Sequence, residues 1–389
     1  MKNFRNALAG IVLIVLTTVS LVWLTQRNVP IRSTLDGRNL AMYSNPSVAT
    51  FLDGSWMKQT ENFVDDRMPA RRVLLNLHAA IATQAFRQSE VAGVWIDRDT
   101  NMLFDKIPVL PPIERFDSDL SALQNTAASN HVPMLFVYVP KKEEVFSDVL
   151  PTHWKNTYVE HKPATLKEFA KHGLVLDLTP IVGDTSTRSR MWFNTDHHWN
   201  GNGAIAASNA VREKLAALGL PAPQALPVLD VKTKYPDFIG SVGRKITYVG
   251  VPQADKFSTK WSSSATLHRC VNQPAETKVC TSSVFVKSRA KDKDVYANRY
   301  SVYMGGDNGM DDVRGDGTGT YIIFKDSYGD AFTPYFALGA KRVVTIDERH
   351  YKGVPIADLI KSVKPDGIIF MHNQLTLSTF TDHEASVWR

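Results

Sequence analysis

The chain has 389 residues, of which 43% are hydrophobic and 22% charged, as in a globular protein of one large or two smaller domains. Its formal net charge of +6 suits an anionic polymer or a membrane surface, although the basic residues form no run. The sequence has neither zinc-finger spacing nor the aromatic motif of RNA-binding domains. Nucleic acid is therefore not an expected partner.

The first 27 residues are predicted to form a short cytoplasmic tip and a transmembrane anchor. Residues 6–26 carry no formal charge, whereas Lys2 and Arg5 precede them and Arg27 follows. A helix of this length would extend about 31 Å, enough to cross the hydrocarbon core of a bilayer. A cleaved signal peptide is the alternative, but no small-x-small cleavage site follows Leu24. Positive residues before the span predict a single-pass membrane protein with its N-terminus in the cytoplasm and its main domain exported.

Residues 28–50 contain turn signals such as Asn45-Pro46 and are predicted to be a stem, with the main domain at residues 51–389. Apolar side chains at helical spacing predict helices over residues 48–86, interrupted near Met68-Pro69, and a hairpin follows at residues 91–104. Helices and apolar strands then alternate. The strands are expected at residues 134–139, 174–178, 321–324, 342–346 and 367–371, and the helices at 117–130, 165–172, 204–218, 332–338 and 356–362.

This alternation predicts an α/β fold of three layers around a parallel sheet. Residues 221–300 break the rhythm and are predicted to be a β-rich insertion. The insertion contains both cysteines of the chain, Cys270 and Cys280, separated by a turn signal at Asn272-Gln273-Pro274. In an oxidising compartment we expect them to form a disulfide, with two free buried thiols as the alternative.

Two segments carry complementary chemistry. In the first, Asp196 and His198 lie two residues apart on an irregular segment, so the carboxylate can bind the imidazole Nδ1 and leave Nε2 as a base. In the second, an apolar strand ends in Lys325-Asp326-Ser327-Tyr328-Gly329, which places Ser327 at the tip of a turn, as in α/β hydrolytic enzymes. Together they predict a catalytic triad of Ser327, His198 and Asp196.

Donors for the oxyanion are expected from the backbone N–H of Ser327 or Tyr328. Asn373 is a further candidate because it follows another strand at the carboxyl edge of the sheet. Each segment also has a plainer interpretation, since histidines beside tryptophan often pack structurally and a serine after a strand is often a helix cap.

A metal site is the competing interpretation of the first segment. Asp196, His197 and His198 are all metal-ligand types, and His153 or His161 could complete a set. Adjacent histidines are expected to point apart on an extended chain and to share an ion rarely. The sequence therefore predicts no metal site and no cofactor.

Thr195-Asp196-His197-His198-Trp199 resembles the signature of the DHHW family of bacterial extracytoplasmic proteins, which are similar to the SGNH-hydrolase-like periplasmic proteins of alginate O-acetylation. Weaker matches extend the resemblance from about residue 50 to the C-terminus; they include residues 63–71, 93–96, 139–142 and 300–308. As in the acetylation proteins, the Asp-x-His pair precedes the serine. Lys325 replaces the glycine of the Gly-Asp-Ser motif of ordinary SGNH hydrolases, so their oxyanion-hole geometry is not transferred to this chain.

The resemblance implies an SGNH-hydrolase-like fold and a serine-dependent O-acyltransferase, most simply an O-acetyltransferase, acting on a cell-envelope or secreted polysaccharide. It also implies a membrane-bound O-acyltransferase partner that supplies the acyl group. Contacts to substrate or oxyanion are expected from Tyr328, Asn373, His197 and Lys325. A carbohydrate esterase with the same triad and a non-catalytic polysaccharide-binding or assembly protein are the alternatives.

Overall fold

The computed structural model describes residues 27–230, 235–262, 266–272, 278–380 and 386–388, with isolated positions between residues 10 and 25. The predicted anchor, residues 1–27, thus lies almost entirely outside the described residues. Among the helices that are described, none combines the length and the apolar character that a membrane span requires.

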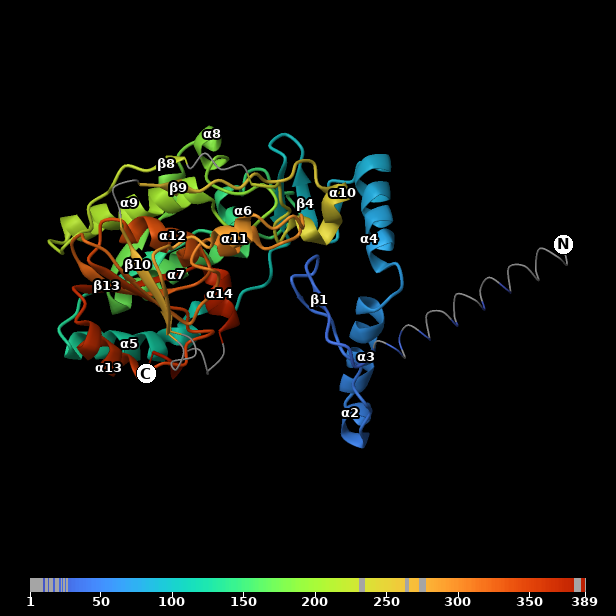
Figure 1. Cartoon of the computed structure of the whole chain (residues 1–389), viewed down its shortest axis with the longest axis horizontal. Helices are drawn as coiled ribbons and strands as arrows, with labels where there is room; N and C mark the ends of the chain where they lie inside the picture. The colour runs from blue at the N-terminus through green and yellow to red at the C-terminus, as the bar shows by residue number, and fades with distance from the viewer. Residues whose placement is uncertain are drawn as a thin grey trace.

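An eight-stranded sheet forms the centre of the fold, with the strand order β11-β10-β12-β14-β13-β15-β6-β7 (Figure 1). Its strands are β6 (Met134–Tyr138), β7 (Leu174–Asp177), β10 (His268–Asn272), β11 (Lys278–Thr281), β12 (Met310–Arg314), β13 (Thr320–Lys325), β14 (Arg342–Ile346) and β15 (Gly367–His372). Strands β14, β13, β15, β6 and β7 are parallel; the apolar runs that predicted the first four are buried, whereas the edge strand β7 is partly exposed.

The prediction of a parallel sheet is wrong for the other side, where β12, β10 and β11 continue the sheet in antiparallel pairs. The sheet is therefore mixed. Strand β12 has no apolar run because it buries Asp311 and Asp312, which are neutralised by Arg269 at 2.8 Å and Arg342 at 2.9 Å. Buried ion pairs in a strand remove the hydrophobic pattern by which strands are recognised.

Helices cover both faces of the sheet, so the predicted three-layer α/β arrangement is confirmed. Successive side chains of each central strand enter opposite cores: Leu135 and Ile323 pack beneath α9 (Gly201–Ala217) and α12 (Tyr328–Ala337), whereas Phe136 and Ile322 pack against the other helices. Those helices are α5 (Asp117–Ser129), α7 (Thr157–His172) and α13 (Ile356–Val363). In Figure 1, α9 and α12 lie above the sheet and α5 and α13 below it.

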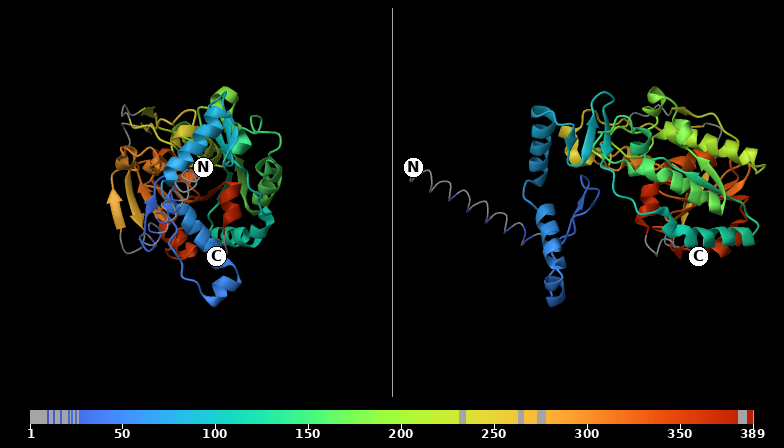
Figure 2. Two further views of the ribbon diagram at one scale, coloured as in Figure 1. Left: turned by 90° about the vertical axis from the view of Figure 1, so that its right-hand side faces the viewer. Right: turned by 180° about the vertical axis from the view of Figure 1, so that it is seen from behind.

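The N-terminal helices stand apart from the central sheet (Figure 2). They are α2 (Val48–Leu52), α3 (Ser55–Asp66) and α4 (Arg71–Ala80), continued by a π-helical turn (Ile81–Ala85), with the predicted interruption between α3 and α4. The small sheet β3 (Glu90–Val91), β4 (Val94–Asp97) and β5 (Met102–Asp105) connects them to the body. Residues 28–50 include the hairpin β1 (Arg32–Ser33) and β2 (Arg38–Asn39), where Arg38 binds Asp66 of α3 with two hydrogen bonds of 2.7 and 2.8 Å.

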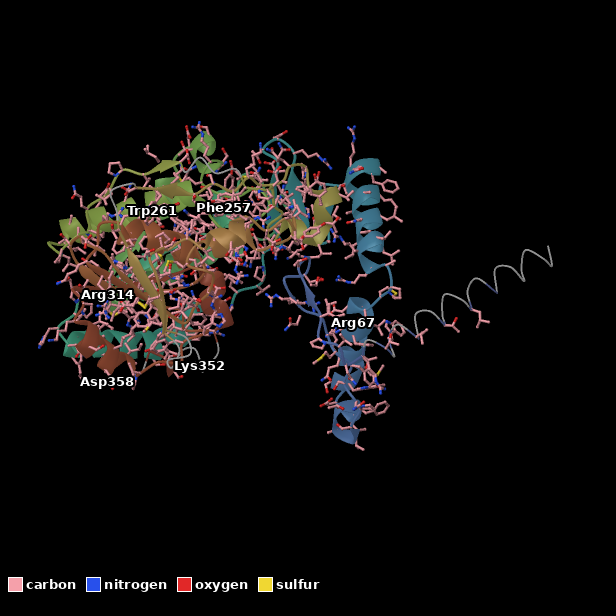
Figure 3. All side chains as sticks on the ribbon, in the orientation of Figure 1. Arg67, Phe257, Trp261, Arg314, Lys352 and Asp358 are labelled. Atoms are coloured by element: carbon pink, nitrogen blue, oxygen red, sulfur yellow. A yellow bond between two sulfur atoms is a disulfide. The ribbon has the colours of Figure 1, made fainter. Side chains whose placement is uncertain are left out.

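The described parts of residues 221–300 pack on the rest of the main domain and contribute β10 and β11 to its sheet. Phe257 and Trp261, labelled in Figure 3, belong to this region; Phe257 stacks on Phe193 at a ring-centroid distance of 6.0 Å. Cys270 and Cys280 lie opposite each other on β10 and β11 and form the predicted disulfide. Residues 273–277 of the intervening turn lie outside the described residues.

The remaining short elements connect these parts of the fold. They are the 3-10 turns η2 (Ile113–Phe116), η3 (Thr179–Val182), η4 (Gly243–Ile246) and η5 (Arg299–Val302), the strands β8 (Leu229–Asp230) and β9 (Lys260–Trp261), and the helices α6 (Lys142–Val145), α8 (Thr185–Arg188), α10 (Thr247–Gly250), α11 (Lys287–Ala290) and α14 (Gln374–Thr379).

Candidate active site

Ser327 lies in the turn between β13 and α12, at the carboxyl edge of the sheet. Every residue from 320 to 340 is buried except Ser327, which is partly accessible. Its side chain makes no capping hydrogen bond to α12, so the helix-cap interpretation of this serine does not apply. The fold therefore exposes a single hydroxyl on an otherwise buried strand-turn-helix unit.

The Asp196 segment reaches the same edge of the sheet and brings its imidazole to this hydroxyl. His198 Nε2 is 2.7 Å from Ser327 Oγ, and His198 Nδ1 is 2.6 Å from Asp196 Oδ1. In the tautomer with the proton on Nδ1, this N–H donates a hydrogen bond to Asp196, and Nε2 accepts one from the Ser327 hydroxyl. Backbone N–H groups of His198 and Ser241 donate to the two Asp196 oxygens at 3.0 and 2.9 Å. The structure thus joins the three predicted residues in one hydrogen-bonded chain.

The electrostatics of this chain keep Asp196 ionised. Burial acts to raise the pKa of the Asp196 carboxyl, but the charge and hydrogen bond of His198, helped by His197 and the Ser241 N–H, hold it well below its usual range. Desolvation and the nearby charges of His198 and Lys141 lower the pKa of His197, so this second imidazole is neutral at pH 7. A charged carboxylate hydrogen-bonded to the imidazole that faces a serine is the arrangement that supports proton abstraction from this serine.

His198 lies between two rings. On one side Tyr300 stacks on it, with ring centroids 3.8 Å apart and an interplanar angle of 8°, and on the other His197 lies at 3.8 Å. His197 Nδ1 also binds Ser241 Oγ at 2.6 Å, and its side chain is 30% exposed. Tyr328 donates its hydroxyl to the His197 carbonyl at 2.6 Å. These contacts restrict the imidazole of His198 to the plane that faces Ser327.

The predicted oxyanion donors differ in their availability. Tyr328 N–H donates to Asp326 Oδ1 at 2.9 Å, and Asn373 Nδ2 donates to Asp326 at 2.6 Å and to Thr376 at 3.0 Å. An oxyanion bond from either residue would therefore have to replace an existing one. The N–H of Ser327, by contrast, has no acceptor among the described residues. It is the expected backbone donor for a tetrahedral oxyanion.

Lys325 lies beneath the nucleophile turn and away from its accessible side. It is 1% exposed and forms ion pairs with Asp330 in the first turn of α12 and, at 3.5 Å, with Asp347 after β14. Burial opposes its charge, but these two carboxylates outweigh that effect and raise the pKa of Lys325. The side chain also covers Gly329, whose Cβ, if present, would lie 2.5 Å from the Lys325 Cβ. Lys325 thus braces the turn, and its ammonium is already neutralised.

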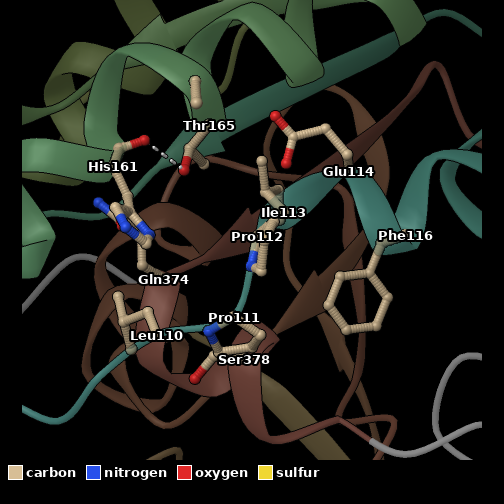
Figure 4. A pocket seen from close by; sticks show the side chains of 11 residues that line it. Leu110, Pro111, Pro112, Ile113, Glu114, Phe116, His161, Thr165, Gln374 and Ser378 are labelled. Carbon is tan, nitrogen blue, oxygen red and sulfur yellow. Dashed lines mark hydrogen bonds between the residues drawn. The ribbon is translucent and has the colours of Figure 1, made fainter.

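The geometry of Asp196, His197 and His198 is compatible with the metal alternative. Contrary to the expectation that adjacent histidines point apart, the His197 and His198 rings lie against each other, and one ligand atom from each, with one from Asp196, lies within 4.8 Å of the others. The predicted extra ligands are elsewhere: His153 binds Glu90 at 2.8 Å, and His161 lines a separate cavity of about 200 Å³ between α7 and α14 (Figure 4). None of the triad residues lines that cavity.

Four residues at the site were not found from the sequence: Ser241, Tyr300, Lys142 and Asp255. Ser241 and Tyr300 contact Asp196 and His198 directly, and Lys142 and Asp255 bind the backbone of the Asp196 loop. Their contacts join residues far apart in the chain, and many of them involve backbone atoms or a ring face, so they leave no spacing in the sequence. The only available signal was that Lys142 follows a buried strand, where a charged residue needs an internal partner.

Comparison with known proteins relates the chain to O-acetylation proteins. Residues 110–286 match the family described as "SGNH hydrolase-like domain, acetyltransferase AlgX". The probable alginate O-acetylase AlgJ of Pseudomonas syringae pv. tomato is 24% identical over 202 residues, 46% of this chain and 47% of the relative. The chain thus matches about half the length of this curated relative.

Solved structures share the fold. A DHHW family protein from Eubacterium siraeum superposes with a TM-score of 0.58 at 18% identity, covering 76% of this chain and 95% of that one. Bacillus cereus PatB1, solved with a sulfonyl adduct, gives a TM-score of 0.60 at 16% identity, covering 74% and 96%. These findings confirm the predicted resemblance: the chain has the SGNH-hydrolase-like α/β fold, and its residues 110–286 are similar to the domain named for the acetyltransferase AlgX.

Proposed function

We propose that this chain is a serine-dependent O-acyltransferase, most simply an O-acetyltransferase, that modifies a cell-envelope or secreted polysaccharide outside the cytoplasm. The observation that carries the proposal is the continuous chain Ser327 Oγ, His198 Nε2 and Nδ1, Asp196 Oδ1, with bonds of 2.7 and 2.6 Å, ending in an accessible hydroxyl. The relatives support transfer of an acetyl group, since their names describe an acetyltransferase and a probable alginate O-acetylase.

The geometry accounts for both halves of a ping-pong reaction. His198 Nε2 takes the proton of Ser327 Oγ as this oxygen attacks the carbonyl carbon of the acyl donor, and the Ser327 N–H donates to the oxyanion. When the tetrahedral intermediate collapses, His198 returns the proton to the leaving group and the acyl group stays on Ser327. A sugar hydroxyl then attacks the acyl-serine, His198 accepts its proton, and Ser327 Oγ recovers a proton as it leaves.

The location and partner are part of the same proposal. The uncharged stretch at residues 6–26 would anchor the chain in the inner membrane with its catalytic domain in the periplasm. A membrane-bound O-acyltransferase would deliver the acyl group there. A reporter fused after Arg389 should then be active only outside the cytoplasm, and the full-length protein should fractionate with membranes. Recovery of a soluble form that lacks residues 1–26 would contradict the anchor.

The test of the activity is mass spectrometry of the intact full-length protein after exposure to a chromogenic acetyl ester. A mass increase of one acetyl group that is absent from Ser327→Ala is the expected result. Adding candidate polysaccharides then separates the proposal from its alternative: loss of the adduct with acetylation of the polymer indicates a transferase, and loss to water alone an esterase. Unchanged turnover in Ser327→Ala would exclude the serine mechanism and favour a non-catalytic binding protein.

A further inference from the structure

The loop that carries the base has little regular structure of its own to hold it. An isolated bridge between Trp192 and Trp199 closes a loop that contains residues 193–196, and this loop lies outside the central sheet. Even so, Asp196 and His198 must meet Ser327, which is fixed by β13 and α12. Something must therefore set the position of this backbone.

We infer that Lys142 and Asp255 are positioning residues for the proposed reaction, which grip residues 193–196 from opposite sides and so hold Asp196 and His198 against Ser327. The inference rests on the proposed function. Neither residue touches the reacting atoms; both act through the backbone of the loop.

Lys142 binds carbonyl groups of the loop. Its Nζ lies 2.7 Å from the carbonyl oxygen of Phe193, 2.9 Å from that of Asn194 and 3.2 Å from that of Asp196. A fourth carbonyl, that of Leu103 in β5, lies at 2.9 Å. The side chain is fully buried and forms no ion pair among the described residues, so these carbonyls replace the solvation of its charge. An ammonium has only three hydrogens. The carbonyls of Phe193, Asn194 and Leu103 make the three shorter contacts, and the Asp196 carbonyl makes the longest one.

Asp255 accepts hydrogen bonds from N–H groups of the same segment. Its Oδ1 accepts from Asn194 N–H at 2.6 Å, and its Oδ2 accepts from Thr195 N–H at 2.7 Å and from the Thr195 hydroxyl at 2.5 Å. Burial raises the pKa of Asp255 to about 6, although these hydrogen bonds and the charge of Lys142 act to lower it. The segment is thus held by a cation on its carbonyl side and by an anion on its N–H side. Opposite charges oriented in this way fix both translation and rotation of the peptide planes.

This arrangement connects directly to the triad. The Asp196 carbonyl bound by Lys142 belongs to the residue that orients His198, and the Thr195 hydroxyl bound by Asp255 accepts the Gly240 N–H at 2.7 Å, next to Ser241. Ser241 N–H in turn binds Asp196 Oδ2. A shift of the loop by about 1 Å would misalign the base, and displacements of that size cost on the order of 100-fold in rate.

The test compares full-length Lys142→Met and Asp255→Asn with the parent protein. Met has a similar length without a charge, and Asn has nearly the same shape but offers one accepting oxygen to two N–H donors. We expect each variant to react with phenylmethanesulfonyl fluoride about 100-fold more slowly at Ser327. The KM for the chromogenic ester should stay unchanged. The double variant should lose no more than the worse single one, because both act on the same loop.

Three measurements separate positioning from a general structural role. Thermal unfolding monitors the fold, and the far-downfield proton resonance of His198 Nδ1–H reports the bond to Asp196 without any turnover. Lys162→Met is the matched control, since Lys162 is a mostly buried lysine paired with Glu144 at 3.4 Å and Asp177 at 2.8 Å, away from the loop. It should keep both the labelling rate and the resonance.

Folded Lys142→Met and Asp255→Asn variants that label at the parental rate and keep the resonance would overturn the inference. If Lys142→Met does not fold, Asp255→Asn alone decides by the same readouts. Failure of the proposed function is a different result: there the parent protein itself would not be labelled at Ser327, or Ser327→Ala would retain full turnover.

Discussion

Asp196→Asn examines the orientation of the base, because the carboxylate accepts three N–H bonds and an amide of the same shape has only one accepting oxygen. If the NH₂ group replaces Oδ1, it donates to His198 Nδ1 and forces the imidazole proton onto Nε2, which then cannot accept from Ser327. If it replaces Oδ2, the tautomer is kept, but the NH₂ group faces the Ser241 N–H at 2.9 Å. Each orientation leaves one buried backbone N–H without an acceptor, so neither is strongly preferred on that ground.

The size of the effect follows from these two orientations. Either one removes the negative charge that stabilises the imidazolium formed during attack. A hydrogen bond to a charged group is worth about 1.5–3 kcal/mol, which corresponds to roughly 10- to 150-fold in rate. The inverted tautomer costs about 10⁴-fold in a well-studied serine-protease triad. We therefore expect the acylation rate constant of Asp196→Asn to fall by about 10- to 10⁴-fold.

The assay is single-turnover acylation by the chromogenic ester at pH 7, where the low pKa of Asp196 keeps the parent carboxylate charged. Asp366→Asn is a suitable control, because its carboxylate also accepts a backbone bond, from Thr320 at 2.7 Å, but at the opposite end of β13. A loss below about 10-fold in Asp196→Asn, with normal folding, would refute the orienting role, since even the charge contribution alone predicts more.

Three further predictions concern the disulfide, the buried lysine and the metal alternative. Alkylation of denatured, unreduced protein should leave Cys270 and Cys280 unlabelled, and Cys270→Ser/Cys280→Ser should lower the free energy of unfolding by about 2–3 kcal/mol; labelling of both thiols would contradict this. Burial lowers the pKa of Lys142 to about 8, against the opposing effects of Asp255, Glu143 and Asp196, with Lys141 adding to the lowering. Because the folded state then releases this proton before the unfolded state does, the contribution of Lys142 to stability should rise between about pH 8 and pH 10.5 while acylation falls; an acylation profile flat to pH 10, in a parent protein that stays folded, would count against it. Treatment with EDTA should leave acylation unchanged, whereas a loss restored by Zn²⁺ would favour a metal at Asp196, His197 and His198.

Elements with an uninterrupted apolar run were predicted correctly from the sequence. The strand expected at residues 342–346 has those bounds in the structure, and Ser327 follows β13 as expected. Elements whose pattern is interrupted were shortened: α7 begins at Thr157 although the prediction began at residue 165, because Pro163 inside the helix resembles a boundary. Likewise α9 begins at Gly201, since glycines in a first turn weaken the helical signal.

For the site, sequence reasoning identified the residues whose chemistry is written in their side chains. Serine, histidine and aspartate at suitable positions predict a triad, and the structure places those side chains within hydrogen-bonding distance, while their catalytic role stays a prediction. The role of Lys142 depends on which carbonyls surround it, and that of Tyr300 on a ring stacked against His198. Both arise from tertiary contacts over long separations, which no local pattern encodes.

The brace beneath the nucleophile limits which sequences this turn can adopt. An engineer who wished to restore the Gly-Asp-Ser motif of ordinary SGNH hydrolases would replace Lys325 with glycine. That single change would leave Asp330 as a buried, unpaired carboxylate, a situation that typically costs about 3–5 kcal/mol, whereas Asp347 would keep its ion pair with Arg349 at 2.6 Å. The conversion would thus have to replace Asp330 together with the lysine, and loss of the lysine side chain would also remove the atoms nearest to a side chain at position 329. Exchange of the two motifs therefore calls for coupled substitutions at positions 325 and 330 rather than for Lys325→Gly alone.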